Sequence, residues 1–359
     1  MKYLYALLLI VLCVYSYVLI DPNITFINDP FWPVLQEKFT YVGYYMRETS
    51  WRIYLISVIL LFAFHFWFIR SKKKHNALSI SLIVAICLVL AYPFLSHDFF
   101  NYMFDAKILT YYHQNPYLFR ALDFPGDQWL RFMHWTHRTY PYGPAFLIIS
   151  SIPSFFSFGK FIVSFFLFKS MFIGFYIGAV FFLKKIDNKK ALIFATHPLV
   201  ILEGLISSHN DLIAVSLGII GIYYLLQKNN KISTLLFLLS GGIKYITLPL
   251  LILMRKNTLF YRGAFMSVLL LLIYLSIREE VQPWYFLNVL IFLPFFSEFI
   301  SDLKLFFFGL LMSYYPYIRL GGWDTAEKVG LKHTIIFVFF VLNIVYLLYK
   351  KSRIQFLTR

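Results

Sequence analysis

The stretch IYLISVILLFAFHFWFI, residues 53–69, and the cluster RSKKK that follows it at residues 70–74 decide the fold class. An apolar run of this length, if helical, crosses most of the hydrocarbon core of a bilayer. Lys and Arg residues directly after such a run mark its cytoplasmic end by the positive-inside rule. This stretch therefore predicts a membrane-spanning helix whose C-terminal end faces the cytoplasm.

The composition extends this interpretation to the whole chain. Of 359 residues, 60% are hydrophobic and only 14% are charged, whereas soluble domains carry roughly 45–50% apolar and about 25% charged residues. The net charge of +16 would suit a nucleic-acid-binding protein, but the basic residues form short clusters between apolar runs, as at residues 184–190. We therefore interpret them as topology signals and expect no nucleic-acid partner. Cys13 and Cys87 both lie in apolar runs, so we expect buried thiols and no disulfide.

Ten apolar runs are candidate spans: residues 3–20, 53–69, 77–95, 161–183, 191–206, 212–226, 263–277, 284–296, 303–318 and 334–349. The first run is long and lacks a small-residue cleavage site, so we expect an uncleaved span. Two more runs, 143–158 and 232–254, are ambiguous. All dense basic clusters share one side only if residues 143–158 do not cross, and if residues 232–254 form a re-entrant hairpin that turns at Gly241-Gly242.

This arrangement predicts an all-α, polytopic protein of the cell membrane. We expect a single integral membrane domain over residues 1–359, with about ten transmembrane helices, the re-entrant hairpin, and juxtamembrane helices at the outer face. Both termini then lie in the cytoplasm. The extracytoplasmic side holds two large segments, residues 21–52 and 96–160.

The outer segment SHDFFNYMFDAKILTYYHQNPY, residues 96–117, is the most informative for function. Ser96 suits a helix cap, and Asp98, Tyr102 and Asp105 then line one helix face. The phenylalanines between them predict an interfacial helix that lies against lipid. The alternative for Asp98 is a helix cap with no chemical role.

Four later motifs add polar or aromatic residues at the same side of the membrane. They are HRTYPYGPAF (137–146), HPLVILEGLISSHNDL (197–212), GGIKYITLP (241–249) and QPWY (282–285). Each has a simpler interpretation: a Pro/Gly turn, solvated loop residues, a lysine that reaches toward water, and an aromatic belt. Glu203 lies within an apolar run, where an acid usually faces a cavity or a partner.

In this order, the motifs between residue 96 and about residue 285 resemble the GT-C superfamily of membrane glycosyltransferases. The nearest resemblance is to the polyprenol-phosphate-mannose-dependent α-mannosyltransferases of bacterial envelopes. It implies an enzyme that moves a hexose, with mannose expected, from a polyprenyl-phosphate donor to a glycolipid or glycan acceptor at the extracytoplasmic face. Asp98 and Asp211 match the acids of the first and second loops of the family. His97 stands where many members carry a second acid, so we expect no metal at a paired-acid site and no cofactor.

The chemistry of sugar transfer from a lipid phosphate needs a base for the acceptor hydroxyl and cations for the leaving phosphate. We assign the base to Asp98. The residues expected to bind substrate are Asp105, Tyr102, Tyr117, Arg138, His209, Asp211, Lys244, Trp284 and Tyr285.

Two other classes of function compete with a transferase. A transporter or flippase would explain Lys169, Glu203 and Lys244 within apolar runs, but the chain shows no internal repeat. A membrane scaffold would not explain why polar residues gather at one face.

Overall fold

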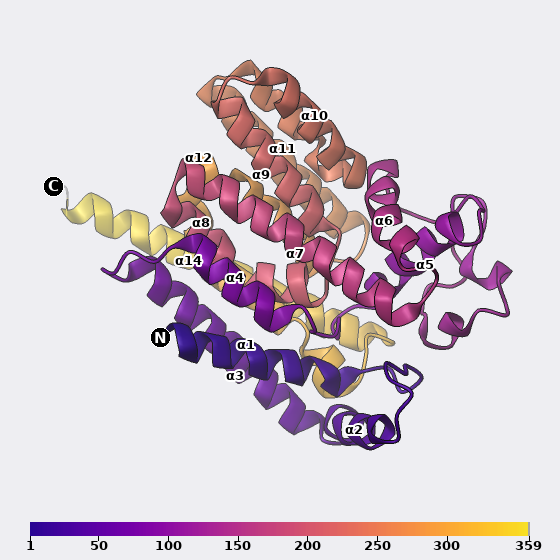
Figure 1. The fold of residues 1–359 in the computed structure, drawn as a ribbon. Coiled ribbons are helices and arrows are strands. Elements are labelled where there is room, and N and C mark those ends of the chain that lie inside the picture. The colour runs from indigo at the N-terminus through magenta and orange to yellow at the C-terminus, as the bar shows by residue number, and fades with distance from the viewer. Residues whose placement is uncertain (358–359) are drawn as a thin grey trace.

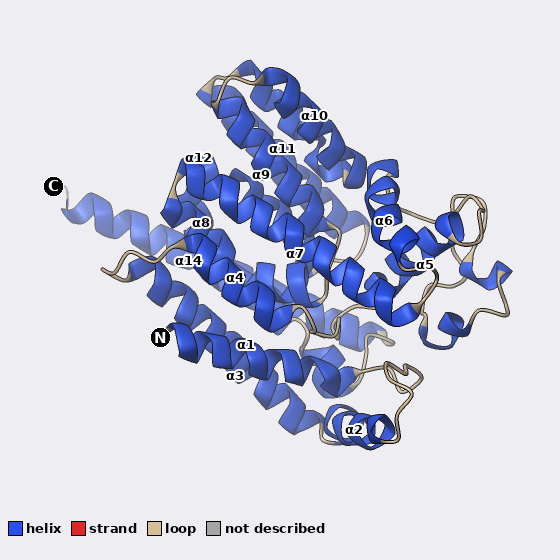
Figure 2. Cartoon of the chain, viewed as in Figure 1, coloured by secondary structure: helices blue, strands red, loops and turns tan. Residues whose placement is uncertain are grey.

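The computed structural model describes residues 1–357, which form helices and loops and contain no strand (Figure 2). Six helical segments are long and apolar enough to cross a membrane: Lys2–Leu19 (α1 and a 3-10 turn), Arg47–Arg70 (α3), Phe161–Ile186 (α7), Thr258–Arg278 (α11), Pro283–Asp302 (a 3-10 helix and α12) and the first 27 residues of Ala326–Leu357 (α14). A bent pair, Val200–Ile206 and Asp211–Leu226 (α9), adds a seventh if it forms one span. The predicted all-α membrane architecture is confirmed, and the count of ten spans stays a prediction.

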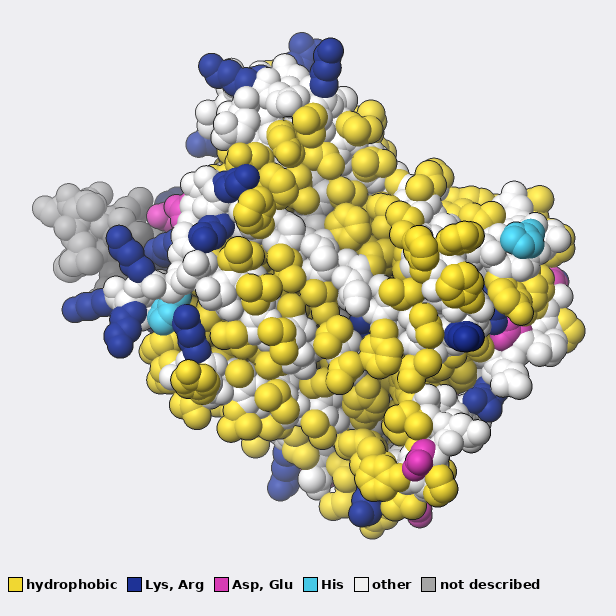
Figure 3. Space-filling view, viewed as in Figure 1, with side chains coloured by type: hydrophobic (Ala, Val, Ile, Leu, Met, Phe, Trp, Pro, Cys, Tyr) yellow, Lys and Arg dark blue, Asp and Glu magenta, His cyan; other side chains and the backbone are white. Residues whose placement is uncertain are grey.

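The two ends of the molecule differ in composition. Both termini lie at the left of Figure 1, and Lys and Arg side chains gather along the left and upper rims of Figure 3. The opposite end holds three short helices: Phe31–Thr40 (α2), Asp98–Thr110 (α5) and Pro144–Phe156 (α6). The segments predicted to be polar outer loops therefore lie together, away from the termini.

Prolines end several apolar runs earlier than hydropathy suggests. The run at residues 77–95 is helical only over Ala77–Leu88 (α4), and residues 89–97, which include Pro93, connect it to α5. The run at 191–206 divides into Asn188–Thr196 (α8) and the π-helix Val200–Ile206, because His197 precedes Pro198 and is extended, with ψ at 123°. A residue before proline avoids the helical region.

The run at residues 232–254 folds back on itself, as predicted. Helix α10 (Asn230–Ile243) is followed by the 3-10 helix Tyr245–Arg255, and Ser240 Oγ donates a hydrogen bond to Thr247 Oγ1 at 2.8 Å. Near the other end of the hairpin, Ser233 Oγ lies 3.8 Å from Met254 Sδ. The chain reverses at Lys244, two residues beyond the predicted Gly241-Gly242 turn.

Helix α6 occupies the other ambiguous run and packs beside α5 (Figure 1). It has 13 residues, fewer than the roughly 20 that a perpendicular span needs. Its first turn meets the end of α10 so closely that a Cβ on Gly143 would lie 1.9 Å from the Gly242 carbonyl oxygen. This contact joins the outer segment to the hairpin that carries Lys244.

The prediction that α5 lies against lipid is wrong. Phe99, Met103 and Phe104 are fully buried within the protein. The ring of Phe99 meets Phe165 of α7, and Phe104 meets Trp129 of the loop that follows α5. Residues 111–143 fold back over α5, and this long-range packing has no periodic signal in the sequence. Cys13 and Cys87 are free cysteines, as predicted, but both are only partly buried, so the prediction of buried thiols is wrong.

Candidate functional site

Four interruptions in the helices bring the candidate residues together. They are the start of α5, the bend at residues 207–210, the reversal at Lys244, and the start of the 3-10 helix Pro283–Phe292 (η7). The bend at residues 207–210 turns the chain by 111°. Each interruption ends a run of intrahelical hydrogen bonds and presents polar side chains beside it.

A buried lysine on another helix holds the bend in place. Lys169 of α7 is only 1% exposed, and its Nζ donates to the carbonyl oxygens of Leu205 at 2.9 Å and Ile206 at 2.7 Å. A third bond reaches Ser208 Oγ at 3.0 Å. The ammonium group satisfies carbonyls that the end of the π-helix leaves without intrahelical partners. Lys169 therefore serves the bend and lies outside the candidate site.

Asp98 lies at the first position of α5, half-buried between two basic side chains. Its backbone N–H donates to Ser96 Oγ at 3.2 Å. The N-cap residue of α5 is His97, so the prediction that Ser96 caps this helix is wrong, and Asp98 is not its cap either. Arg138 Nη2 lies 3.8 Å from Oδ1, and His209 Nδ1 lies 3.8 Å from Oδ2. Burial raises the pKa of Asp98, and the charges of Arg138 and Lys244 offset part of this effect. The carboxylate is 17% exposed, so a substrate hydroxyl can reach it.

Asp211 and Lys244 form an ion pair beside Asp98. Lys244 Nζ lies 3.0 Å from Asp211 Oδ2, and Asn288 Nδ2 donates to Asp211 Oδ1 at 2.9 Å. Asp211 is 1% exposed, whereas Lys244 is 17% exposed. The alternative of a lysine that only reaches toward water therefore fails, because this ammonium group has a buried partner. The amine also lies over the rings of Tyr142 and Tyr285 at 5.7 and 5.8 Å.

His209 connects the exposed part of the cluster to its interior. Its ring stacks on Trp284, with ring centroids 4.0 Å apart. One ring nitrogen faces Asp98, and the other lies 3.4 Å from Glu203 Oε2. His209 and Glu203 are both fully buried. A solvated loop is therefore excluded for His209 and Asp211.

The structure brings most of the predicted site residues together. Asp98, Arg138, His209, Asp211, Lys244, Trp284 and Tyr285 form one connected cluster. Tyr102 joins it through its edge-to-face contact with Tyr142, with ring centroids 5.0 Å apart.

Two predicted residues stand apart from this cluster. Tyr117 is 40% exposed and donates to the carbonyl oxygen of Tyr142 at 3.1 Å, so it supports the turn before α6. Asp105 is buried further along α5. Burial raises the pKa of Asp105 to about 8, although the positive charge of Arg138 opposes the shift.

Sequence reasoning missed three members of the cluster. Glu203 stood out as an acid in an apolar run but was not placed in the site. Asn288 is the one polar residue in the apolar run 286–293, and a polar residue in such a run could have indicated a place in the site. Tyr142 lies in the motif HRTYPYGPAF, for which the sequence alone also allows a simple Pro/Gly turn.

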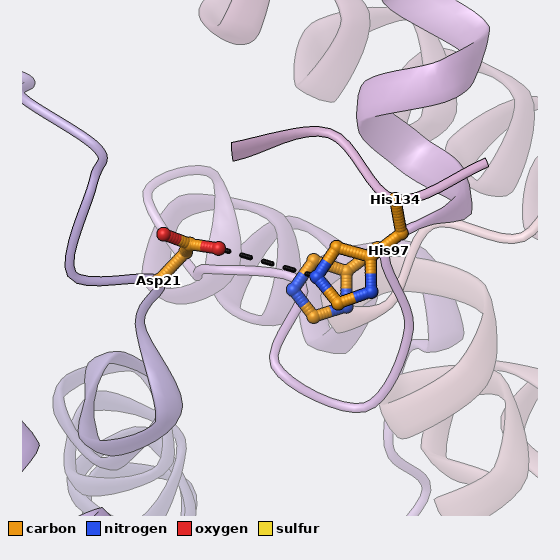
Figure 4. A group of neighbouring side chains, drawn as sticks. All are labelled: Asp21, His97 and His134. Carbon is orange, nitrogen blue, oxygen red and sulfur yellow. Dashed lines mark ion pairs between the residues drawn. The ribbon is translucent and has the colours of Figure 1, made fainter. Parts of the chain in front are cut away.

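A second group of polar side chains includes His97, the residue directly before Asp98. Asp21, His97 and His134 point toward one another (Figure 4), and their ligand atoms all lie within 4.8 Å of one another. These residues could hold a metal ion. His97 is the residue that stands in place of the second acid of the family, so this group differs in its ligands from the paired-acid site that the sequence argued against.

The fold and the cluster define a polytopic α-helical membrane protein whose buried and half-buried charges converge at one end of the helices. No curated protein and no solved structure matches the chain significantly. Residues 9–257 match the MptA_B family, described as alpha-(1->6)-mannopyranosyltransferase, N-terminal domain, and the chain belongs to this family. The predicted resemblance to α-mannosyltransferases is thereby confirmed. The matched range includes Asp98, Arg138, His209, Asp211 and Lys244, and ends before Trp284. The role of each residue stays a prediction.

Proposed function

We propose that this protein transfers mannose from a polyprenyl-phosphate donor to a hydroxyl group of a glycolipid or glycan acceptor, at the extracytoplasmic face of the membrane. The observation that carries the proposal is the position of Asp98. A half-buried carboxylate lies between Arg138 and His209, next to the ammonium group of Lys244, in a chain of a mannosyltransferase family. A base and cations in one place are what this reaction needs.

The proposed reaction is a direct, inverting displacement of the GT-C type. The acceptor hydroxyl oxygen forms a bond to C1 of mannose, and the bond between C1 and the phosphate oxygen breaks. The phosphate leaves with the electron pair, and Asp98 takes the hydroxyl proton. No metal or cofactor takes part in these steps.

Arg138 and Lys244 are suited to hold the phosphate. Their side chains are 36% and 17% exposed, so each can add an anion to its existing carboxylate partner. Arg has five N–H donors and Lys has three. His209 is held between Trp284 and Glu203. Its Nδ1 lies 3.8 Å from Asp98 Oδ2, so it limits the movement of this carboxylate.

The surface of α6 supports a lipid-linked donor. Ile148, Ile152 and Phe155 are 60–68% exposed and follow one another at positions i, i+4 and i+7 of this helix. Such residues form one apolar stripe. Because the first turn of α6 packs against the hairpin of Lys244, the stripe gives a prenyl chain a path toward the cluster.

Substituting Asp98 tests the proposal. Purified protein in lipid nanodiscs is given radiolabelled polyprenyl-phosphate mannose and a membrane lipid extract, and the initial rate of label transfer is measured. Asp98→Asn keeps the shape of the side chain but cannot accept the proton, so we expect the rate to fall by roughly 10²–10⁴-fold. Asp123→Asn is the matched control, since Asp123 lies on the same outer segment, paired with Arg120, and it should transfer at the parental rate.

Two results would count against the proposal. A rate for Asp98→Asn within about threefold of the parent would exclude the base. Transfer of label from a soluble nucleotide-sugar, with none from the polyprenyl-phosphate donor, would exclude the proposed donor class.

A further inference from the structure

Asp21, His97 and His134 come from three separate parts of the chain and meet beside the start of α5 (Figure 4). Asp21 follows the first helix, His97 directly precedes α5, and His134 lies on the loop that covers α5. The two imidazoles stack with ring centroids 3.6 Å apart, and Asp21 Oδ2 lies 4.0 Å from His134 Nε2. Residues this far apart in sequence thus bring three ligand atoms within 4.8 Å of one another.

The ligand atoms are free to bind. Asp21 Oδ1 accepts a hydrogen bond from the backbone N–H of Asn23 at 2.8 Å, which leaves Oδ2 toward His134. Among the residues that the structure describes, no hydrogen bond is found for the imidazole of His97 or His134. A neutral imidazole binds a metal ion through the lone pair of one ring nitrogen.

We propose that Asp21, His97 and His134 form a binding site for a divalent transition-metal ion, with Zn²⁺ as the best match. Two imidazoles and one carboxylate are a common ligand set for Zn²⁺, with water in the remaining position. Ligand bonds of about 2.0–2.2 Å bring ligand atoms roughly 3.5 Å apart. The atoms must therefore approach one another, and one of the stacked rings must turn so that both ring planes contain the ion. His134, which is 51% exposed on its loop, supplies this movement and the path of entry.

The ion would have a positioning role. It would fasten the loop after the first helix and the loop around His134 to the residue that precedes Asp98. The ion is not required for any step of the proposed transfer reaction, and the test below does not depend on that reaction.

Metal binding by the full chain tests the site. The protein is purified with a tag that contains no histidine, treated with a chelator, and placed in nanodiscs. Zn²⁺ binding is measured by elemental analysis after gel filtration, by the visible absorption of added Co²⁺, and by the change in melting temperature. We expect one ion per chain, a visible Co²⁺ spectrum of low-coordinate nitrogen and oxygen ligands, and a melting temperature raised by several degrees.

His134→Gln is the decisive variant, because His134 is exposed and its replacement does not threaten the fold. This variant and Asp21→Asn should lose the bound ion, the Co²⁺ spectrum and the thermal shift. The matched control is His137→Gln, an exposed histidine of the same loop outside the group, which should keep all three. Absence of a bound ion in the parent, or equal binding by parent and His134→Gln, would overturn the proposal.

Discussion

The roles of single residues in the candidate site depend on contacts with residues that are distant in the sequence. Lys244 and Asp211 were each predicted to bind substrate, and neither motif suggested that the two form an ion pair. Asp211 is almost fully buried and also accepts a hydrogen bond from Asn288. Removing either charge therefore leaves the other without its counterion in a site of low polarity.

A double-mutant cycle separates the structural and catalytic roles of Lys244. Lys244→Gln and Asp211→Asn should each lower the free energy of unfolding by about 1.5–3 kcal/mol, the range for a charged hydrogen bond. The double variant should lose less than the sum, since neither charge remains unpaired. Thermal melts in nanodiscs give these values.

The rates of mannose transfer complete the cycle. Loss of a phosphate contact of this strength lowers the rate by about 10- to 150-fold in Lys244→Gln, and the double variant should stay as slow. Recovery of the parental rate in the double variant would show that Lys244 only balances the charge of Asp211.

Asp105 predicts a pH dependence of stability. Burial raises the pKa of Asp105 from its ordinary value of 3.8 to about 8 in the folded protein, while Arg138 lowers this pKa and Asp98 raises it. Between about pH 4 and pH 8 the unfolded state loses this proton first, so the contribution of Asp105 to stability falls as pH rises. Asp105→Asn cannot ionise, and its melting temperature relative to the parent should rise over this window and level off above pH 8.

Melts at pH 5, 6.5 and 8 measure this difference, with Asp123→Asn as control. Hydrogen bonds to Arg120 lower the pKa of Asp123, so its titration lies below the window. A constant difference between Asp105→Asn and the parent would mean that the carboxyl group is not held neutral.

At the scale of helices, the sequence predicts which segments are helical better than it predicts the residues at which each helix begins and ends. Long apolar runs required helices, so α3, α7 and α14 lie close to the predicted runs. Their neighbours end at prolines or at tertiary contacts, as α4 does before Pro93. The same limit applies to the site. Motif order indicated which residues matter, but the bend that joins His209 to Glu203 depends on Lys169 of another helix, which no local pattern reports.

The contact between α6 and α10 provides a test at this scale. Gly143→Ala would place a methyl group 1.9 Å from the Gly242 carbonyl oxygen, so the helices must separate. Overpacking of this kind costs about 1–3 kcal/mol, and we expect a lower melting temperature and slower transfer. Gly126→Ala, on the same outer segment with nothing within 4 Å of the added methyl, should behave like the parent. Equal melting temperatures for the two variants would contradict this packing.

For the whole molecule, both termini lie at one end, and α2, α5 and α6 of the outer segments lie at the other (Figure 1). The candidate site includes the start of α5. The positive-inside rule predicts an orientation with the basic rim in the cytoplasm. In this proposed orientation Asp98 lies on the extracytoplasmic side, and α6 stays on that side without crossing.

Cysteine labelling tests this orientation. In a background without Cys13 and Cys87, single exposed cysteines are placed at Lys73, Lys189 or Asn230, and at Gln128 or Asp324. An impermeant thiol reagent added to intact cells should label the last two positions and spare the first three. Labelling at position 189 from outside would mean that α6 crosses the membrane.

The bonds of Lys169 bear on how the chain can change over evolution. Two of its three acceptors are main-chain carbonyls, which every amino acid supplies at positions 205 and 206. The lysine is therefore constrained, while the residues whose carbonyls it holds can be exchanged for other apolar types without weakening the contact. In an alignment of relatives, we therefore expect the position of Lys169 to be constant. Positions 205 and 206 should vary among apolar residues without covarying with it.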